Sequence, residues 1–176
     1  MPIPNKPTKI LLIGAECTGK STLAAALAQR YQGVIVPEYL RLFLDTKPQG
    51  YVCTFDDIVP IAQAQIKLEN NAMQANDKLI ICDTSVILLA IYSQWYFGQV
   101  ADELWDMINT LSYDAIFVTD DIGITWVADG QRDLPHGRHL MRDEIIKTLE
   151  KLGLSFVPIT GSVDSRMAQV ANYLGL

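Results

Sequence analysis

Residues 14 to 21 contain the residue types that bind phosphate groups. The stretch GAECTGKS fits the pattern G-x-x-x-x-G-K-[ST] at every fixed position, with Gly14 and Gly19 followed by Lys20 and Ser21. The glycines let successive backbone amides turn inward, so that they and the N-terminus of the next helix surround phosphate oxygens. Lysine then reaches the β- and γ-phosphates, and serine ligates magnesium. This stretch predicts a site for ATP and Mg²⁺, completed by Glu16, Cys17, Thr18 and Thr22.

The residues on either side of this loop match the structural context that the motif requires. Residues 9–13, KILLI, form a short apolar run typical of a buried strand, and residues 22–30 are rich in strong helix formers. A strand, a phosphate-binding loop and a helix are therefore predicted in succession. The motif does not specify which molecule accepts the phosphoryl group.

Polar side chains also follow the next predicted strand. Residues 34–36, VIV, are followed by Pro37 and then by Glu38 and Arg41, which lie one helical turn apart. Ligands bind at the carboxyl ends of strands in open α/β sheets, so we expect both side chains to face a cleft and contact the substrate. A surface ion pair is the alternative.

Asp83 closes a third apolar run, residues 78–83, at its C-terminal tip. In a P-loop protein this pattern resembles the Walker B strand, whose aspartate helps to hold magnesium. Asp83 is therefore a second candidate for metal binding and catalysis. The alternative is that Asp83 only caps the helix that begins near Ser85, since aspartate favours that position.

Aromatic residues form a second group of candidates for substrate binding. Trp95, Tyr96 and Phe97 are consecutive and point in different directions on any regular element, so at least one is expected to face a cavity or a partner. Such a ring stacks on a planar ligand or attracts a cationic one. Packing in the core explains the cluster equally well.

Arginines are concentrated in a polar segment that contains two glycines and a proline. Within residues 126–139 the chain reads WVADGQRDLPHGRH, which in an acidic protein suggests a mobile lid over the phosphates, spanning about residues 121–141. Arg132 is the first candidate, with Arg138 and Arg142 behind it. Asp120 and Asp121, just before this segment, are expected to be a solvated loop pair; the alternative is that one of them orients a metal-bound water.

The remaining segments continue the alternation of strands and helices. Residues 56–76 have the spacing of an amphipathic helix, on which Gln63 and Gln65 are expected to be exposed, with contact to a substrate as the alternative. Loops after the last strand of P-loop kinases commonly contact the base, so Gly161, Ser162 and Arg166, which follow the strand at 154–160, are candidates for adenine contacts.

The whole chain predicts one α/β domain spanning residues 1–176. A mainly parallel five-stranded sheet with helices on both faces, the three-layer P-loop NTPase architecture, is the expected fold. The net charge of −6 argues against a broad nucleic-acid footprint. Three cysteines without metal-ligand spacing suit a reduced cytoplasmic compartment, and we expect neither a signal peptide nor a membrane span.

Taken together, these motifs resemble the NadR-type ribosylnicotinamide kinases over nearly the whole length. Five stretches carry the resemblance: the P-loop with Glu16, the run PEYLR at 37–41, DTS at 83–85, WYFG at 95–98, and WVADGQR at 126–132, which is close to the Trp-Val-x-Asp-Gly-x-Arg lid of the family. The lid string is the most discriminating. Ser85 departs from the family pattern, which has an acidic residue there, and Leu40 and Gln131 alter neighbouring contacts.

The resemblance implies transfer of the γ-phosphoryl group of ATP to the 5′-hydroxyl of nicotinamide riboside. Lys20, magnesium on Ser21 and Arg132 would supply positive charge, and either Asp83 or Glu38 would orient the acceptor hydroxyl and take its proton. Trp95, Tyr96 or Trp126 would stack on the nicotinamide ring.

Two other functions remain open at this stage. A kinase of another nucleoside or small metabolite would share every phosphate-binding residue and differ in the acceptor pocket. A nucleotide-dependent regulatory switch is the second alternative, although no Asn-Lys-x-Asp run for reading guanine follows a strand. The oligomeric state is not predicted.

Overall fold

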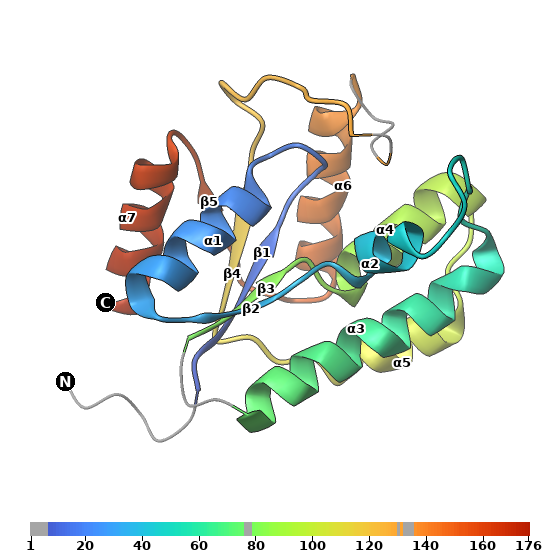
Figure 1. The fold of residues 1–176 in the computed structure, drawn as a ribbon, viewed down its shortest axis with the longest axis horizontal. Coiled ribbons are helices and arrows are strands. Elements are labelled where there is room, and N and C mark those ends of the chain that lie inside the picture. Colours follow the sequence, from blue (N-terminus) through green and yellow to red (C-terminus); the bar gives the residue numbers. More distant parts are fainter. Residues whose placement is uncertain (1–6, 76–78, 130, 132–135) are drawn as a thin grey trace.

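The computed structural model describes residues 7–75, 79–129, 131 and 136–176. Within these residues five strands form one sheet in the order β2-β3-β1-β4-β5, and every neighbouring pair is parallel (Figure 1). The strands are β1 (Lys9–Ile13), β2 (Val34–Val36), β3 (Ile80–Asp83), β4 (Ala115–Thr119) and β5 (Val157–Ile159). Because the strands are parallel, their carboxyl ends all meet at one edge of the sheet.

Helices cover both faces of this sheet, and alternation along β1 directs its side chains to each face in turn. Leu11 and Ile13 pack with α3 (Phe55–Ala75), α4 (Val86–Phe97), α5 (Asp102–Asn109) and α6 (Arg138–Lys151). Ile10 and Leu12 pack instead with α1 (Lys20–Tyr31) and α7 (Val163–Leu174). The predicted three-layer fold is confirmed, with a core on each side of the sheet.

The short helix α2 (Tyr39–Asp45) packs against α3 at the carboxyl edge and carries none of the fully buried side chains (Figure 1). It follows β2 after only two residues, Pro37 and Glu38. The sequence prediction placed Glu38 and Arg41 one turn apart at the end of a strand, and α2 supplies that turn.

The helices begin and end at residues with recognisable local chemistry. Ser85 begins α4, since its hydroxyl accepts from the amide of Ile87 at 3.2 Å, and Ser162 begins α7 in the same way. Gly98 and Gly175 end α4 and α7 in left-handed conformations. In the part of the chain that the structure describes, no helix is both long and apolar enough to cross a membrane.

Candidate active site

The predicted phosphate-binding loop connects β1 to α1 as the motif requires. Gly14 leaves no room for a side chain, because an added Cβ would overlap Thr119 Oγ1 and lie 2.9 Å from the Thr119 carbonyl oxygen. Gly19 begins α1 with φ +80°, a conformation that glycine adopts without strain. The loop therefore depends on both glycines, one for close packing and one for its turn.

Lys20 closes the loop from inside. Its ammonium donates to the carbonyls of Gly14 at 2.9 Å and Ala15 at 2.8 Å, and the side chain is buried. Burial lowers the pKa of Lys20, and the nearby carboxylates of Asp83 and Glu38 partly offset that effect. Lys20 is thus a buried cation held next to two acidic groups, at the point where phosphates would enter.

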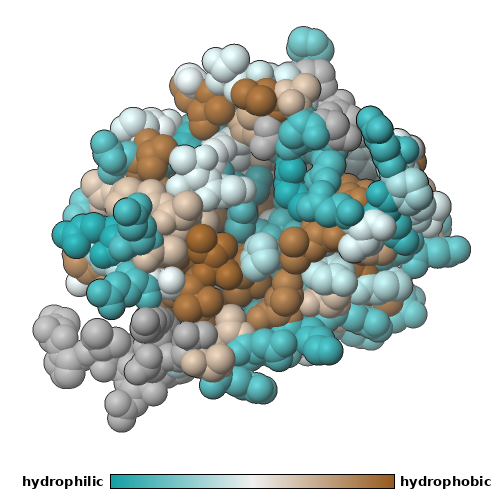
Figure 2. Space-filling model, viewed as in Figure 1, coloured by the Kyte–Doolittle hydropathy of each residue, from teal (hydrophilic) through white to brown (hydrophobic). Residues whose placement is uncertain are grey.

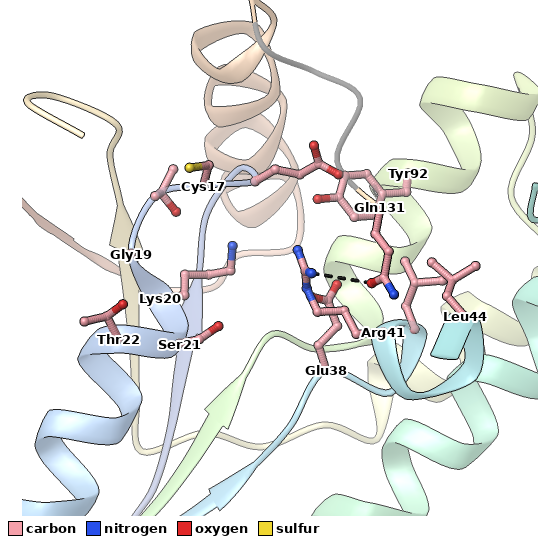
Figure 3. Close-up of a pocket in the computed structure, with 13 residues that line it drawn as sticks. Cys17, Gly19, Lys20, Ser21, Thr22, Glu38, Arg41, Leu44, Tyr92 and Gln131 are labelled. Carbon is pink, nitrogen blue, oxygen red and sulfur yellow. Dashed lines mark hydrogen bonds and ion pairs between the residues drawn. The ribbon is translucent and has the colours of Figure 1, made fainter. Parts of the chain in front are cut away.

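The loop forms one wall of an open cleft at the carboxyl edge of the sheet. Lys20 extends from the start of α1, while Glu38 and Arg41 extend from the start of α2 into the same cavity (Figure 3). The molecular surface is hollowed between α1 and α2, with hydrophilic side chains around the hollow (Figure 2). The other lining residues are Glu16, Cys17, Thr18, Gly19, Ser21, Thr22, Leu40, Leu44, Tyr92 and Gln131.

Glu38 is a carboxylate that lines this cleft at the start of α2. Its Oε2 accepts from Arg41 Nε at 3.2 Å, so the i,i+3 ion pair exists, but it lies inside the cavity and not on an open surface. Burial raises the pKa of Glu38, whereas Lys20 and Arg41 lower it in part. A carboxylate with a raised pKa and a place in a cleft is suited to accept a proton.

Gln65 holds the backbone on both sides of Glu38. Its Oε1 accepts from the amide of Tyr39 at 2.7 Å, and its Nε2 donates to the carbonyl of Pro37 at 3.3 Å. Gln65 is 3% exposed, so the sequence prediction that this residue is exposed was wrong. Its position on α3 one helical turn after the buried Ile61 was the signal for burial.

Asp83 does not cap the next helix, because Ser85 does so. This observation removes the structural alternative for Asp83 and gives Ser85 a role of its own. Among the described residues, Asp83 Oδ1 and the neighbouring Thr84 Oγ1 are buried without a hydrogen-bond partner. Thr84 also has φ +84°, an uncommon conformation for a β-branched residue. Buried oxygens without partners at a strained turn indicate a place for a ligand.

These donors fit a magnesium ion. The unpartnered oxygen of Asp83 and the exposed hydroxyl of Ser21 are hard oxygen ligands, which magnesium prefers. Magnesium keeps several waters and takes phosphate oxygens from its nucleotide, so one or two protein ligands suffice. In the described residues no group of three or more His, Cys, Asp or Glu side chains forms a metal site.

A second, smaller cavity adjoins the cleft and shares Glu38, Leu40 and Tyr92 with it. Its walls are mostly apolar side chains of α3 and α4, and the unpartnered Thr84 hydroxyl lies among them. The remaining lining residues are Ile61, Gln65, Ser85, Val86, Leu88 and Leu89. The two cavities therefore adjoin at Glu38: the larger one, at the P-loop, is mainly polar, and the smaller one is mainly apolar.

Tyr92 is the aromatic residue that lines both cavities, and the sequence prediction missed it. It lies one helical turn before Tyr96, and the centroids of the two rings are 6.1 Å apart. Trp95 and Tyr96 are exposed at the end of α4, and Trp126 packs 5.8 Å from the guanidinium of Arg138. None of these three lines either cavity, so their contact with substrate stays a prediction.

The predicted lid reaches across the P-loop and contacts α2. The Sγ atom of Cys17 donates to the Thr125 carbonyl and accepts from the amide of Val127, each at 3.4 Å. Further along, Asp129 pairs with Arg41 at 2.8 Å. Gln131 also donates to Asp45, on α2, at 2.8 Å, and accepts a weaker bond from Arg41. Arg132, the arginine expected to contact phosphates, lies outside the described residues.

The residues predicted to contact adenine lie at the start of α7. Gly161 is exposed, with φ +94°. Arg166 is 2% exposed and pairs with Asp120 at 3.0 Å behind the P-loop. Asp120 is therefore buried, and the expectation that Asp120 and Asp121 form a solvated pair was wrong for Asp120.

The strand order, the parallel sheet and the loop after β1 define a P-loop nucleotide-binding domain with the fold of P-loop kinases. This class is shared by several families. A family model described as an AAA domain matches residues 9–166, and the chain belongs to this family. No curated protein matches the sequence.

Solved structures share the same fold at low sequence identity. The NadR protein in complex with NR aligns with a TM-score of 0.82 and 21% identity, over 97% of this chain and 52% of that one. The NadR protein in complex with NAD and AMP-PNP aligns with a TM-score of 0.79 and 20% identity, over 97% of this chain and 50% of that one. Thymidylate kinase from Ehrlichia chaffeensis aligns with a TM-score of 0.66 and 16% identity, over 96% of this chain and 99% of that one. The chain spans about half the length of the NadR chains, and the predicted likeness to them is confirmed at the level of the fold.

Proposed function

We propose that this protein transfers the γ-phosphoryl group of ATP to the 5′-hydroxyl of nicotinamide riboside and produces nicotinamide mononucleotide. The observation that carries the proposal is the pair of joined cavities, with Lys20 in the polar one and Glu38 between the two. The NadR structures, which contain NR in one case and AMP-PNP in another, support this choice of substrates.

The P-loop residues would bind the triphosphate. The ammonium of Lys20 lies 2.8–2.9 Å from two carbonyl oxygens of the loop. A turn of this side chain toward the cleft would let it contact the β- and γ-phosphates. Asp83 and Ser21 would hold magnesium, which neutralises charge on these phosphates when it is bound. Phosphoryl transfer depends mainly on such positioning and charge neutralisation.

Glu38 would orient the acceptor hydroxyl and take its proton. We assign this role to Glu38, and the metal-binding role to Asp83, because Glu38 lines both cavities and Asp83 has the unpartnered oxygen at the strand end. Arg41 binds one oxygen of Glu38 and keeps the carboxylate within the cleft. Tyr92, which lines both cavities, would contact the planar ring, and Thr84 would bond a ribose hydroxyl.

A substrate panel tests the proposal. Purified protein is mixed with Mg·ATP and one acceptor at a time: nicotinamide riboside, uridine, cytidine, thymidine, thymidine monophosphate, or none. ADP formation and the phosphorylated product are both measured. We expect the highest kcat/KM with nicotinamide riboside, and Lys20→Ala protein serves as the control for contaminating kinases. Equal turnover of ordinary nucleosides without turnover of nicotinamide riboside would contradict the proposal.

A kinase of another nucleoside or nucleotide is the second candidate function. The fold likeness to thymidylate kinase, which extends over 96% of this chain, favours it. Preference for thymidine monophosphate in the panel would identify this function. Slow ATP hydrolysis that no acceptor accelerates would instead favour a regulatory switch.

A further inference from the structure

Two arginines hold adjacent carbonyl groups of the P-loop from outside the cleft. Arg166, from α7, donates to the carbonyl of Thr18, and Arg138, from the start of α6, donates to the carbonyl of Cys17 at 3.1 Å. Neither arginine lines the cleft. Sequence reasoning expected both to contact the nucleotide directly, Arg166 at adenine and Arg138 at the phosphates.

Each arginine is paired with one of two adjacent aspartates at the end of β4. Arg166 Nη2 lies 3.0 Å from Asp120 Oδ1, and Arg138 Nε lies 3.2 Å from Asp121 Oδ2. Arg166 also donates to the backbone carbonyl of Asp120 at 3.0 Å. The two guanidinium charges are therefore balanced locally, and what they give the loop is directed hydrogen bonds.

Holding a carbonyl fixes the direction of the amide in the same peptide unit. A trans peptide is planar, and its C=O and N–H point in opposite directions; no cis peptide occurs in the described residues. With the Thr18 carbonyl held on Arg166, the amide of Gly19 points away from α7, toward the cleft side of the loop. By the same geometry the Cys17 carbonyl on Arg138 directs the amide of Thr18.

The surroundings of Gly19 support this arrangement. A Cβ added there would lie 3.5 Å from Arg166 Nη1 and 3.4 Å from Ile124 Cδ1, so the loop is packed against both elements. The hydroxyl of Thr18 adds a third contact, 2.7 Å from Thr119 Oγ1 on β4. Three segments distant in sequence, namely the P-loop, the end of β4 with the loop after it, and α7, therefore meet behind the phosphate site.

We infer that Arg166 and Arg138 are positioning residues for the phosphate cradle: they hold the carbonyls of Thr18 and Cys17 so that the amides of Gly19 and Thr18 face the triphosphate before it binds. This inference depends only on the nucleotide-binding part of the proposed function. It gives the paired aspartates 120 and 121 a purpose, which is to hold each guanidinium in place.

Calorimetric binding tests this inference with two ligands, Mg·AMP-PNP and Mg·tripolyphosphate, the second of which lacks a base. The variants are Arg138→Met, and Arg166→Met combined with Asp120→Asn so that no charge is left unpaired in the core. Arg30→Gln, at an exposed arginine on α1, is the control. We expect Arg138→Met and the double variant each to bind about tenfold more weakly, with the same factor for both ligands. The control should bind as wild type does.

Amide NMR spectra of the protein without ligand distinguish a positioning role from a direct contact with phosphate. Loss of the arginine hydrogen bond should shift or broaden the signal of the Thr18 amide in Arg138→Met, and that of the Gly19 amide in the Arg166 and Asp120 double variant. If the double variant does not fold, Arg138→Met alone decides.

Three results would overturn the inference: unchanged affinities, loss confined to AMP-PNP, which indicates an adenine contact, or unchanged amide signals in the free protein. Failure of wild-type protein to bind either ligand would instead refute the proposed nucleotide site, and the two failures are thereby distinguished.

Discussion

Replacing Gln65 by leucine should impair catalysis without touching a residue that contacts the phosphates. Leucine is apolar and slightly larger than glutamine, so the change removes two hydrogen bonds without opening a void. The amide of Tyr39, a half-buried residue, loses a bond of 2.7 Å, whereas the carbonyl of Pro37, an exposed residue, loses a longer bond of 3.3 Å. We expect the free energy of unfolding to fall by about 1.5–3 kcal/mol, most of it from the Tyr39 amide.

The effect on turnover follows from the place of Glu38 between the two bonded residues. Releasing both neighbours lets the carboxylate move by a fraction of an ångström to an ångström, and displacement on that scale costs roughly 10- to 100-fold in rate. The loss should appear in kcat more than in the KM for ATP, since the P-loop is unchanged. Steady-state kinetics and urea unfolding measure the two effects separately.

Gln63→Leu is the matched control, because Gln63 is exposed on the same helix two residues away. Its stability should stay within about 0.5 kcal/mol of wild type and its kcat should not change. A Gln65→Leu protein with wild-type kcat would refute the assignment of Gln65 as the residue that positions Glu38. Equal effects of the two substitutions would do the same.

The other predictions concern pH, the buried ion pair at the opposite end of the sheet, and the lid. Burial raises the pKa of Glu38 above its ordinary value of 4.5, and a base works only when it is ionised, so kcat/KM should fall as pH decreases through that raised pKa. Glu38→Gln protein should be slow, and its pH profile should lack this acidic decrease. An identical decrease in that variant would exclude Glu38 as the base. Lys9→Met leaves Glu69, which is 1% exposed, without its ion-pair partner at 2.9 Å, while the Tyr113 hydroxyl still donates to it, so urea unfolding should show a loss of about 3–5 kcal/mol. Lys9→Met with Glu69→Gln, which removes the unpaired charge and keeps an acceptor for Tyr113, should recover most of this loss, and equal losses would contradict this explanation. Arg132→Ala should lower kcat more than ATP affinity, and unchanged turnover would remove this arginine from the mechanism.

Local sequence patterns were sufficient to predict the fold and the phosphate-binding loop. The loop motif specifies its own backbone, and short apolar runs that end in a polar residue mark parallel strands and the edge where Glu38 and Asp83 meet. These signals depend on neighbouring residues only. The predicted elements therefore agree with the structure to within a few residues.

Residues that act through distant contacts were harder to predict. Gln65 and Arg166 are polar residues on buried helix faces, and each has its partner in a segment far away in sequence. Helical spacing gives a signal for burial, as with Arg166 and Val170 four residues apart, but not for the partner. Tyr92 was not predicted, because it ends an apolar run typical of a buried helix and precedes the more conspicuous run of three consecutive aromatics.

Isotope transfer is the most direct test of the central claim that ATP phosphorylates nicotinamide riboside in this cleft. ATP labelled with heavy oxygen in its γ-phosphoryl group is incubated with nicotinamide riboside, magnesium and the protein, and the products are examined by mass spectrometry. We predict that the label appears in nicotinamide mononucleotide, in equal amount with ADP. Label found only in inorganic phosphate, with nicotinamide riboside unchanged, would contradict the claim.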